Sequence, residues 1–158
     1  MIKKVAEKLD EWMVAKNLEA PAEGFLQLRP CRIRILGQMA LLEGGASLTL
    51  TLTNGVDVYA DYDYEVQCEF RRLLAQEGKE LDPLGEEIWM PRETEYADLY
   101  RGRYVTLQVA DADSVLLSKA LKAPGKNRAL LVEYLARGAS ERFLKLVDKY
   151  AVDLEQFL

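Results

Sequence analysis

Aspartates gather in one stretch of the sequence, and their spacing suits metal-assisted chemistry. Asp57, Asp61 and Asp63 stand at odd-numbered positions just after the turn-forming pair Asn54 and Gly55. In an extended segment alternate residues point to the same face, so these three carboxylates would lie along one side. Carboxylate oxygens are ligands that Mg²⁺ prefers. We therefore predict a site led by Asp57, which Asp61 and Asp63 would join as a pair of metal-binding carboxylates. Asp63 is equally suited to cap the helix that follows it.

The chain contains no histidine, which removes several classes of chemistry. Catalytic triads with an imidazole base, His–Cys pairs and zinc sites of the HExxH type all require that side chain. The two cysteines, Cys31 and Cys68, lack metal-ligand spacing, and we expect buried thiols rather than a disulfide. Any metal would therefore be a hard ion, such as Mg²⁺, held by Asp, Glu or carbonyl oxygens.

Size and composition indicate an ordinary globular chain. It has 158 residues, 49% of them hydrophobic and 30% charged, which predicts a single domain over residues 1–158. Charged residues interrupt the first residues, unlike a secretory signal, and no run of about 18 apolar residues occurs. We therefore expect a cytoplasmic protein without a membrane partner. The net charge of −5 argues against broad nucleic-acid binding, which needs a concentrated basic surface.

The elements that must position the aspartates begin with a helix and a strand. Apolar residues recur at three- and four-residue spacing from Ile2 to Met13, as in an amphipathic helix. Residues 32–35 alternate between arginine and isoleucine, which predicts a strand buried on one face. Gly37 ends this strand, and residues 38–42 can form one or two helical turns.

The middle of the chain predicts further strands around one helix. Residues 46–53 alternate strictly between small or hydroxyl-bearing residues and leucine, which is typical of a strand. Asn54 and Gly55 then form either the tip of a hairpin or a bulge in one bent strand. The elements expected next are a helix from Asp63 capped by Gly78, a strand at 88–90, a helical turn at 96–100 and a strand at 104–109.

The last third is expected to be helical. Asp111 or Asp113 can cap a first helix that Pro124 breaks, a second helix ends at Gly138, and a third begins after Ser140. The predicted fold is therefore α+β. It has a mixed sheet with flanking helices in a sheet-rich part, 25–110, and a helical bundle at 111–158 that shares its core.

Four segments together resemble the motifs of one family. The strand, glycine turn and helix in ILGQMALL at 35–42 are similar to its glycine motif, and TNGVD at 53–57 is similar to its Thr/Ser-x-Asp-hydrophobic-Asp motif. Glu87 stands where its third carboxylate usually lies, and Lys119, within 114–138, matches its helical lysine. The chain thus resembles the nucleotidyltransferase superfamily, especially small bacterial members related to abortive-infection and toxin–antitoxin proteins.

This resemblance implies a nucleotidyltransferase-like fold and a role for each matching residue. Asp57 and Glu87 would be the catalytic carboxylates and, with Asp61, the ligands of Mg²⁺. Gly37 would let the backbone approach the phosphates of a nucleoside triphosphate, and Lys119 would neutralise them.

The sequence departs from the family pattern at several of these positions. Gly55 replaces the first catalytic aspartate, and Gln38 replaces the second small residue of the glycine motif. Asn127, Arg128 and Leu131 replace the acidic residues that usually follow the lysine. Losing one of two metal-binding carboxylates removes much of the charge that holds the ions. We therefore expect a degenerate active site.

Three functions remain open on the sequence. The first is a pseudoenzyme whose cleft binds a nucleotide, a nucleic-acid end or a protein partner, in a toxin–antitoxin or phage-defence setting. The second is an active Mg²⁺-dependent enzyme that moves a nucleotide from a triphosphate to a protein or RNA acceptor. The third is an unrelated structural or interaction domain, in which Asp57, Glu87 and Lys119 are ordinary surface residues.

Overall fold

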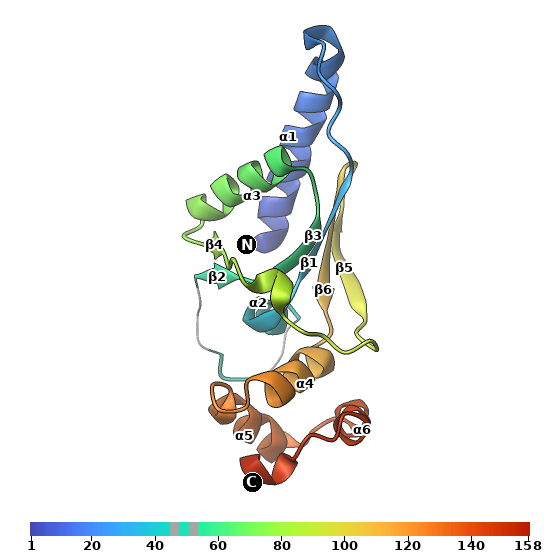
Figure 1. Cartoon of the computed structure of the whole chain (residues 1–158). Coiled ribbons are helices and arrows are strands. Elements are labelled where there is room, and N and C mark those ends of the chain that lie inside the picture. The colour runs from blue at the N-terminus through green and yellow to red at the C-terminus, as the bar shows by residue number, and fades with distance from the viewer. Residues whose placement is uncertain (45–47, 51–53) are drawn as a thin grey trace.

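The computed structural model of the chain describes residues 1–44, 48–50 and 54–158. Within these residues the fold is α+β: helices lie against one face of a mixed sheet, and further helices follow towards the C-terminus (Figure 1). The sheet and its helices occupy one end of an elongated molecule, and the C-terminal helices occupy the other. In the part of the chain that the structure describes, no helix is both long and apolar enough to cross a membrane.

The main sheet has the order β3-β1-β6-β5. Its strands are β1 (Cys31–Ile35), β3 (Val58–Asp61), β5 (Tyr96–Arg101) and β6 (Val105–Ala110). β1 runs parallel to β6 and antiparallel to β3, while β5 and β6 are antiparallel. A second small sheet pairs β2 (Gly55–Val56) in parallel with β4 (Glu80–Leu81).

Alternation of apolar and polar residues explains which face of the sheet is buried. Ile33 and Ile35 of β1 and Leu107 of β6 lie in the core, where α1 (Ile2–Glu23) contacts the sheet and α3 (Tyr64–Gln76) contacts α1. Arg32 and Arg34 alternate with the isoleucines and belong to the opposite face. The predicted strand at 32–35 and its buried face are thus confirmed.

Helix α1 is longer than its sequence pattern predicts, because it continues through Pro21. A proline has no N–H, so the carbonyl of Asn17 loses the hydrogen bond that residue 21 would normally give it. The side chain of Gln27 replaces this donor: its Nε2 donates to the Asn17 carbonyl oxygen at 3.1 Å. Gly24, at φ 77°, then ends the helix.

Side-chain caps begin two of the C-terminal helices, α4 and α6. Asp111 accepts a hydrogen bond from Ser114 N at 2.9 Å at the start of α4 (Ala112–Lys122), and Ser140 accepts one from Phe143 N at 3.0 Å at the start of α6 (Glu141–Lys149). Between them lies α5 (Arg128–Arg137), and a final 3₁₀ turn, η2 (Leu154–Phe157), follows α6. Their buried residues join the same hydrophobic core as the sheet.

Two predicted elements in the middle of the chain are wrong. Residues 96–100 form strand β5 rather than a helical turn, since a bulge between Asp98 and Tyr100 breaks the period of two and places apolar residues at helix-like spacing. Residues 88–90 are not a strand, because the Trp89 carbonyl accepts a hydrogen bond from Ser118 on α4 instead. Glu87 accordingly lies in a 3₁₀ turn, η1 (Gly85–Glu87).

Gly55 begins β2 and pairs with β4. The other arm of the hairpin that the sequence allows, residues 51–53, lies outside the described residues. Of the strand predicted at 46–53, residues 48–50 have no regular structure, and the rest lies outside the described residues. Asp57 stands between β2 and β3, where the chain leaves the small sheet and enters the main one. The helical turns predicted at 38–42 are confirmed as part of helix α2 (Gly37–Glu43).

Candidate functional site

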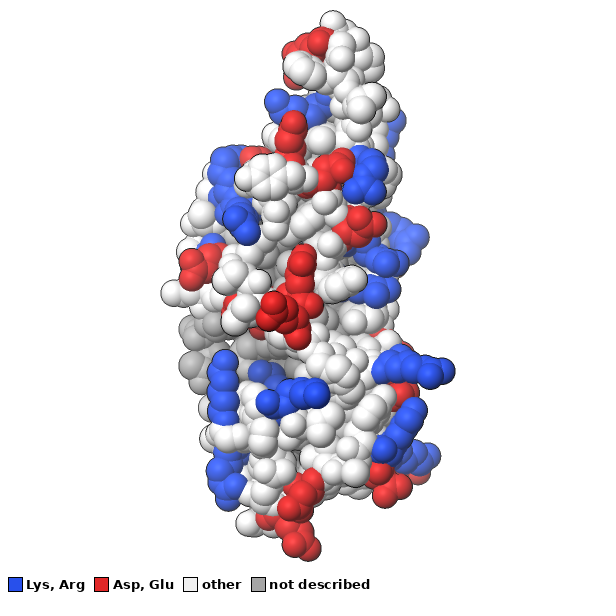
Figure 2. Space-filling view, in the orientation of Figure 1, with Lys and Arg blue, Asp and Glu red and all other residues white. Residues whose placement is uncertain are grey.

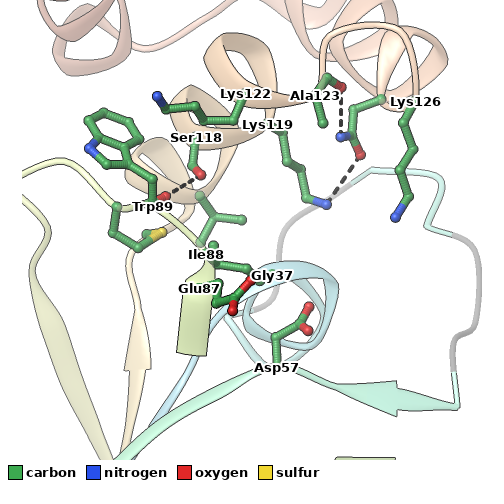
Figure 3. Close-up of a pocket in the computed structure, with 13 residues that line it drawn as sticks. Gly37, Asp57, Glu87, Ile88, Trp89, Ser118, Lys119, Lys122, Ala123 and Lys126 are labelled. Atoms are coloured by element: carbon green, nitrogen blue, oxygen red, sulfur yellow. Dashed lines mark hydrogen bonds between the residues drawn. The ribbon is translucent and has the colours of Figure 1, made fainter. Parts of the chain in front are cut away.

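A cavity of about 430 Å³ lies between the sheet-containing part and the C-terminal helices (Figure 3). Gly37, Asp57 and Glu87 line it from the sheet side, while Lys119, Lys122 and Lys126 line it from the helical side. The surface carries the same division of charge, with acidic side chains above a hollow and basic ones below it (Figure 2). Carboxylates therefore line one side of the cavity, and ammonium groups line the side facing them.

Asp57 is held against two glycines. A Cβ added to Gly37 would stand 2.4 Å from Asp57 Oδ2, and the positive φ of Gly37, 60°, also favours glycine. On the other side, a Cβ on Gly85 would stand 3.1 Å from Asp57 Cα. The Asp57 carbonyl accepts a hydrogen bond from Leu36 N at 2.9 Å, which fixes its backbone to the end of β1. Asp57 thus has a fixed position at the floor of the cavity.

Three lysines come from α4 and the turn after it. Lys119, Lys122 and Lys126 are spaced by three and four residues, and all three line the cavity. Lys119 Nζ donates a hydrogen bond to Asn127 Oδ1 at 3.2 Å, and Asn127 in turn donates to the Ala123 carbonyl at 3.0 Å. Asn127 therefore fixes the half-buried Lys119 so that its ammonium group points towards Asp57 (Figure 3).

Burial shifts both central groups towards their neutral forms. It raises the pKa of the Asp57 carboxyl, Asp82 adds to the rise, and the nearby Lys119 and Lys126 oppose it. Burial also lowers the pKa of Lys119, as does the charge of Lys126, while Asp57 opposes this change. Neither charge is fully compensated by its neighbours. Perturbed groups of this kind, in a cavity, mark a candidate binding or catalytic site.

Trp89 forms another wall of the cavity. Its carbonyl is held by Ser118 of α4, and its ring packs edge to face on Tyr150, with 5.3 Å between ring centroids. Lys122 Nζ lies 5.4 Å from the centroid of the Trp89 ring, within the range of a cation–π interaction. Trp89 is thus a positioned aromatic surface beside the lysines.

The structure brings together four of the predicted site residues. Gly37, Asp57, Glu87 and Lys119 line one cavity although they come from four separate segments. Asp61 is not among the described residues that line it: it is exposed on β3, 3.7 Å from the guanidinium of Arg29. The predicted pair of Asp61 and Asp63 therefore lies beside Arg29 and does not join Asp57 at the cavity.

Asp63 does not cap α3 through its side chain. Its carboxylate instead accepts hydrogen bonds from Arg29 Nε at 2.9 Å and from Arg29 N at 3.0 Å. The two cysteines are free thiols; Cys31 is buried as expected, whereas Cys68 is exposed.

Sequence reasoning missed several residues of the site, including Lys122, Lys126, Gly85 and Asn127. Lys122 and Lys126 follow Lys119 at i+3 and i+7, a spacing that predicts a shared helical face and could have identified them. Gly85 and Asn127 gave no such signal, because Gly85 acts through its contact with Asp57 and Asn127 through its bond to Lys119.

Asp57 and Glu87 are the carboxylates that line the cavity and could contribute to a metal site. Among the described residues, no three acidic or cysteine side chains are grouped so that they could hold a metal ion by themselves. Mg²⁺ commonly binds one or two carboxylates and completes its coordination with substrate phosphates and water. A site of this kind would take its carboxylates from Asp57 and Glu87.

Comparisons of the chain with protein-family models, with curated proteins and with solved structures find no significant match in any of the three.

Proposed function

We propose that the cavity binds a nucleotide, with its phosphates towards Lys119, Lys122 and Lys126, and that it does so without efficient nucleotidyl transfer. The observation that carries this proposal is the placement of three lysines opposite Asp57 across one cavity. The resemblance to the nucleotidyltransferase superfamily agrees with it, because Gly37, Asp57, Glu87 and Lys119 are the residues that match the family motifs.

The lysine side of the cavity suits a polyanion. Lys119 is half-buried and its pKa is lowered by burial and by Lys126, so its charged form lacks compensation. A phosphate group would supply the missing negative charge, and Lys122 and Lys126 are exposed and free to reach further phosphate oxygens. The nearby Trp89 ring offers an apolar face to a nucleobase.

The acidic side of the cavity would hold a Mg²⁺ ion bound to the phosphates. Asp57 and Glu87 are the side chains available for it. Such an ion supplies charge neutralisation between carboxylate and phosphate, which would otherwise repel each other. Asp57, held by Gly37 and Gly85, supplies a fixed ligand, whereas Glu87 is exposed and more adaptable.

Weak catalysis follows from the residues that are missing. Two-metal transfer needs a cluster of carboxylates that brackets both ions. Gly55 stands at the position of the family's first aspartate, and Asp61 pairs with Arg29 instead. The toxin–antitoxin setting of the family members that the chain resembles would make a protein partner the further expectation for such a pseudoenzyme.

Calorimetric titration with MgATP and MgCTP tests the binding proposal. We expect one of them to bind the wild-type chain, and Lys119→Met to weaken that binding about tenfold or more. Lys145→Met is a suitable control, because Lys145 is exposed on α6 and pairs with Glu141 at 3.3 Å. Binding that withstands Lys119→Met, or no binding of either nucleotide, would contradict the proposal.

A transfer assay separates the pseudoenzyme from an active enzyme. The protein is incubated with labelled triphosphates and cell lysate, and protein and RNA are examined for label. Binding without transfer supports the pseudoenzyme. Label that appears with the wild type and is lost with Asp57→Ala would favour the active enzyme instead.

A further inference from the structure

Apolar side chains are exposed together where α1 projects beyond the sheet (Figure 1). Leu26 is 95% exposed, Tyr64 is 76% exposed and Phe25 is 68% exposed, and all three border the same hollow. We call this surface, defined by Phe25, Leu26 and Tyr64, the α1 tip. Grouped exposed apolar side chains on a small protein mark a contact with another molecule.

The α1 tip has a projecting side chain, Leu26, beside a hollow that could receive the same side chain of a second molecule. The hollow beside it has a volume of about 940 Å³, and Ala20 and Leu28 contribute to its wall. Leu26 borders this hollow but is almost fully exposed, so its side chain does not fill the space. A second molecule could therefore enter the hollow at the same surface from which Leu26 projects.

Hydrogen bonds hold the segment that forms the tip. Asn17, which is buried in α1, accepts a bond from Leu28 N at 2.6 Å and donates one to the Leu28 carbonyl at 3.1 Å. Gln27 donates to the Asn17 carbonyl that Pro21 leaves free. These bonds fix residues 24–29 along α1, so the projection and the hollow are built into the fold.

Two of the charges at the rim, on Lys16 and Glu23, are complementary to each other. Lys16 and Glu23 both border the hollow, and they are seven residues apart on α1, which is two helical turns or about 10 Å. Both are exposed, and no ion pair joins either of them to another residue within the described ranges. Two such surfaces facing each other in antiparallel directions would bring Lys16 of one copy to Glu23 of the other, twice.

We infer that the chain forms a symmetric homodimer through the α1 tip. Leu26 of each copy enters the hollow of the other, and Lys16 of each copy pairs with Glu23 of the other. A two-fold interface requires that one surface carry both members of every contact. The α1 tip meets this requirement, since it has its own projection, its own hollow and both signs of charge.

This dimer is independent of the proposed nucleotide site. The α1 tip and the cavity around Asp57 lie at different ends of the sheet-containing part (Figure 1). Two copies joined at their tips would each keep that cavity open. Failure of nucleotide binding would therefore leave the dimer unaffected, and failure of the dimer would leave nucleotide binding unaffected.

Sedimentation velocity over a range of concentrations tests the interface. We expect a dimer at about 100 µM chain, and Leu26→Ser to raise its dissociation constant about tenfold or more, because an apolar anchor is lost. Leu158→Ser is the matched control: Leu158 is 86% exposed but lies in the C-terminal part. A wild type that stays monomeric, or an equal effect of both substitutions, would overturn the inference.

Charge reversal tests the proposed pairing. Lys16→Glu and Glu23→Lys should each weaken the dimer, because each places like charges opposite one another. The double variant Lys16→Glu/Glu23→Lys restores opposite charges across the two-fold axis, and its dissociation constant should return towards that of the wild type. If the double variant is weaker than both single variants, the reciprocal contact is not present and the inference fails.

Discussion

The carboxylate of Asp57 lies against the backbone of Gly37 so closely that a Cβ on residue 37 would stand 2.4 Å from Oδ2. Gly37 also has φ 60°, a backbone conformation that residues other than glycine adopt only at a cost in free energy. Position 37 therefore requires glycine for two separate reasons, one local and one arising from Asp57. Only the second reason concerns the cavity.

Gly37→Ala should destabilise the chain more than backbone strain alone can explain. Strain from the positive φ costs about 1–2 kcal/mol, and the collision with Asp57 should add about 1–3 kcal/mol, as overpacking does. Chemical denaturation measures the sum. Gly24→Ala is the control, because Gly24 has φ 77° but no atom within 4 Å of its added Cβ.

The collision can be isolated by a double-mutant cycle. In an Asp57→Ala background the clashing oxygen is gone, so Gly37→Ala should then cost only about as much as Gly24→Ala. An unchanged cost in that background would show that Asp57 does not lie against Gly37.

Asp57→Asn should stabilise the protein at neutral pH. Because burial and Asp82 raise the pKa of Asp57 above its unfolded value, ionising it costs stability at every pH above the folded-state pKa. Removing that cost should add about 0.5–1 kcal/mol at pH 7, as functional-site substitutions often do. The gain should shrink as the pH falls towards about 4, where the unfolded carboxyl also becomes protonated.

Asp63→Asn should change the stability at neutral pH in the opposite direction to Asp57→Asn. Hydrogen bonds from Arg29 lower the pKa of Asp63, so its carboxylate contributes stability above the unfolded pKa and loses it as the pH falls through the folded pKa. Asp63→Asn should therefore be less stable than the wild type at pH 7 and approach it in acid. Thermal unfolding from neutral to acidic pH compares both variants, and shifts of the same sign would exclude this assignment.

Local patterns account for most of what the sequence predicts correctly. The isoleucines of β1 alternate, Gly37 interrupts them, and Gly78 ends α3 with φ 69°, all of which depend on a few neighbouring residues. Family resemblance, rather than any pattern, gave the reason to join Asp57 with Glu87 and Lys119. Their common cavity depends on how α4 packs on α2, which no local pattern specifies.

The errors arise where a distant contact overrides the local pattern. Arg29 attracts both Asp61 and Asp63, which removes them from the site. A bulge in β5 makes the spacing of Tyr96, Leu99 and Tyr100 look helical. In residues 88–90, the Trp89 carbonyl accepts a hydrogen bond from Ser118 and the segment does not form a strand. In each case the partner (Arg29, strand β6 or Ser118) lies outside the window in which the pattern is read.

Asp10 should be essential for the β5–β6 hairpin. Its buried carboxylate accepts hydrogen bonds from the backbone N–H groups of Arg103, Tyr104 and Val105, at 3.2, 2.6 and 3.0 Å, and from Tyr100 Oη at 3.1 Å. Asp10→Ala leaves these donors without an acceptor and should cost about 3 kcal/mol or more. Tyr100→Phe removes one bond only and should cost about 1 kcal/mol. Equal losses on denaturation would contradict this ranking.

Trp89 should report directly on nucleotide binding. Its ring lines the cavity with Lys122 Nζ 5.4 Å from its centroid, so a bound base or a phosphate that attracts Lys122 changes the surroundings of the indole. The other tryptophan, Trp12, lies on α1 and does not line the cavity. In a Trp12→Phe variant, MgATP or MgCTP should therefore change the fluorescence by about as much as in the wild type, whereas in Trp89→Phe the change should disappear. A signal that follows Trp12 instead would place the ligand near α1, away from Asp57 and the three lysines.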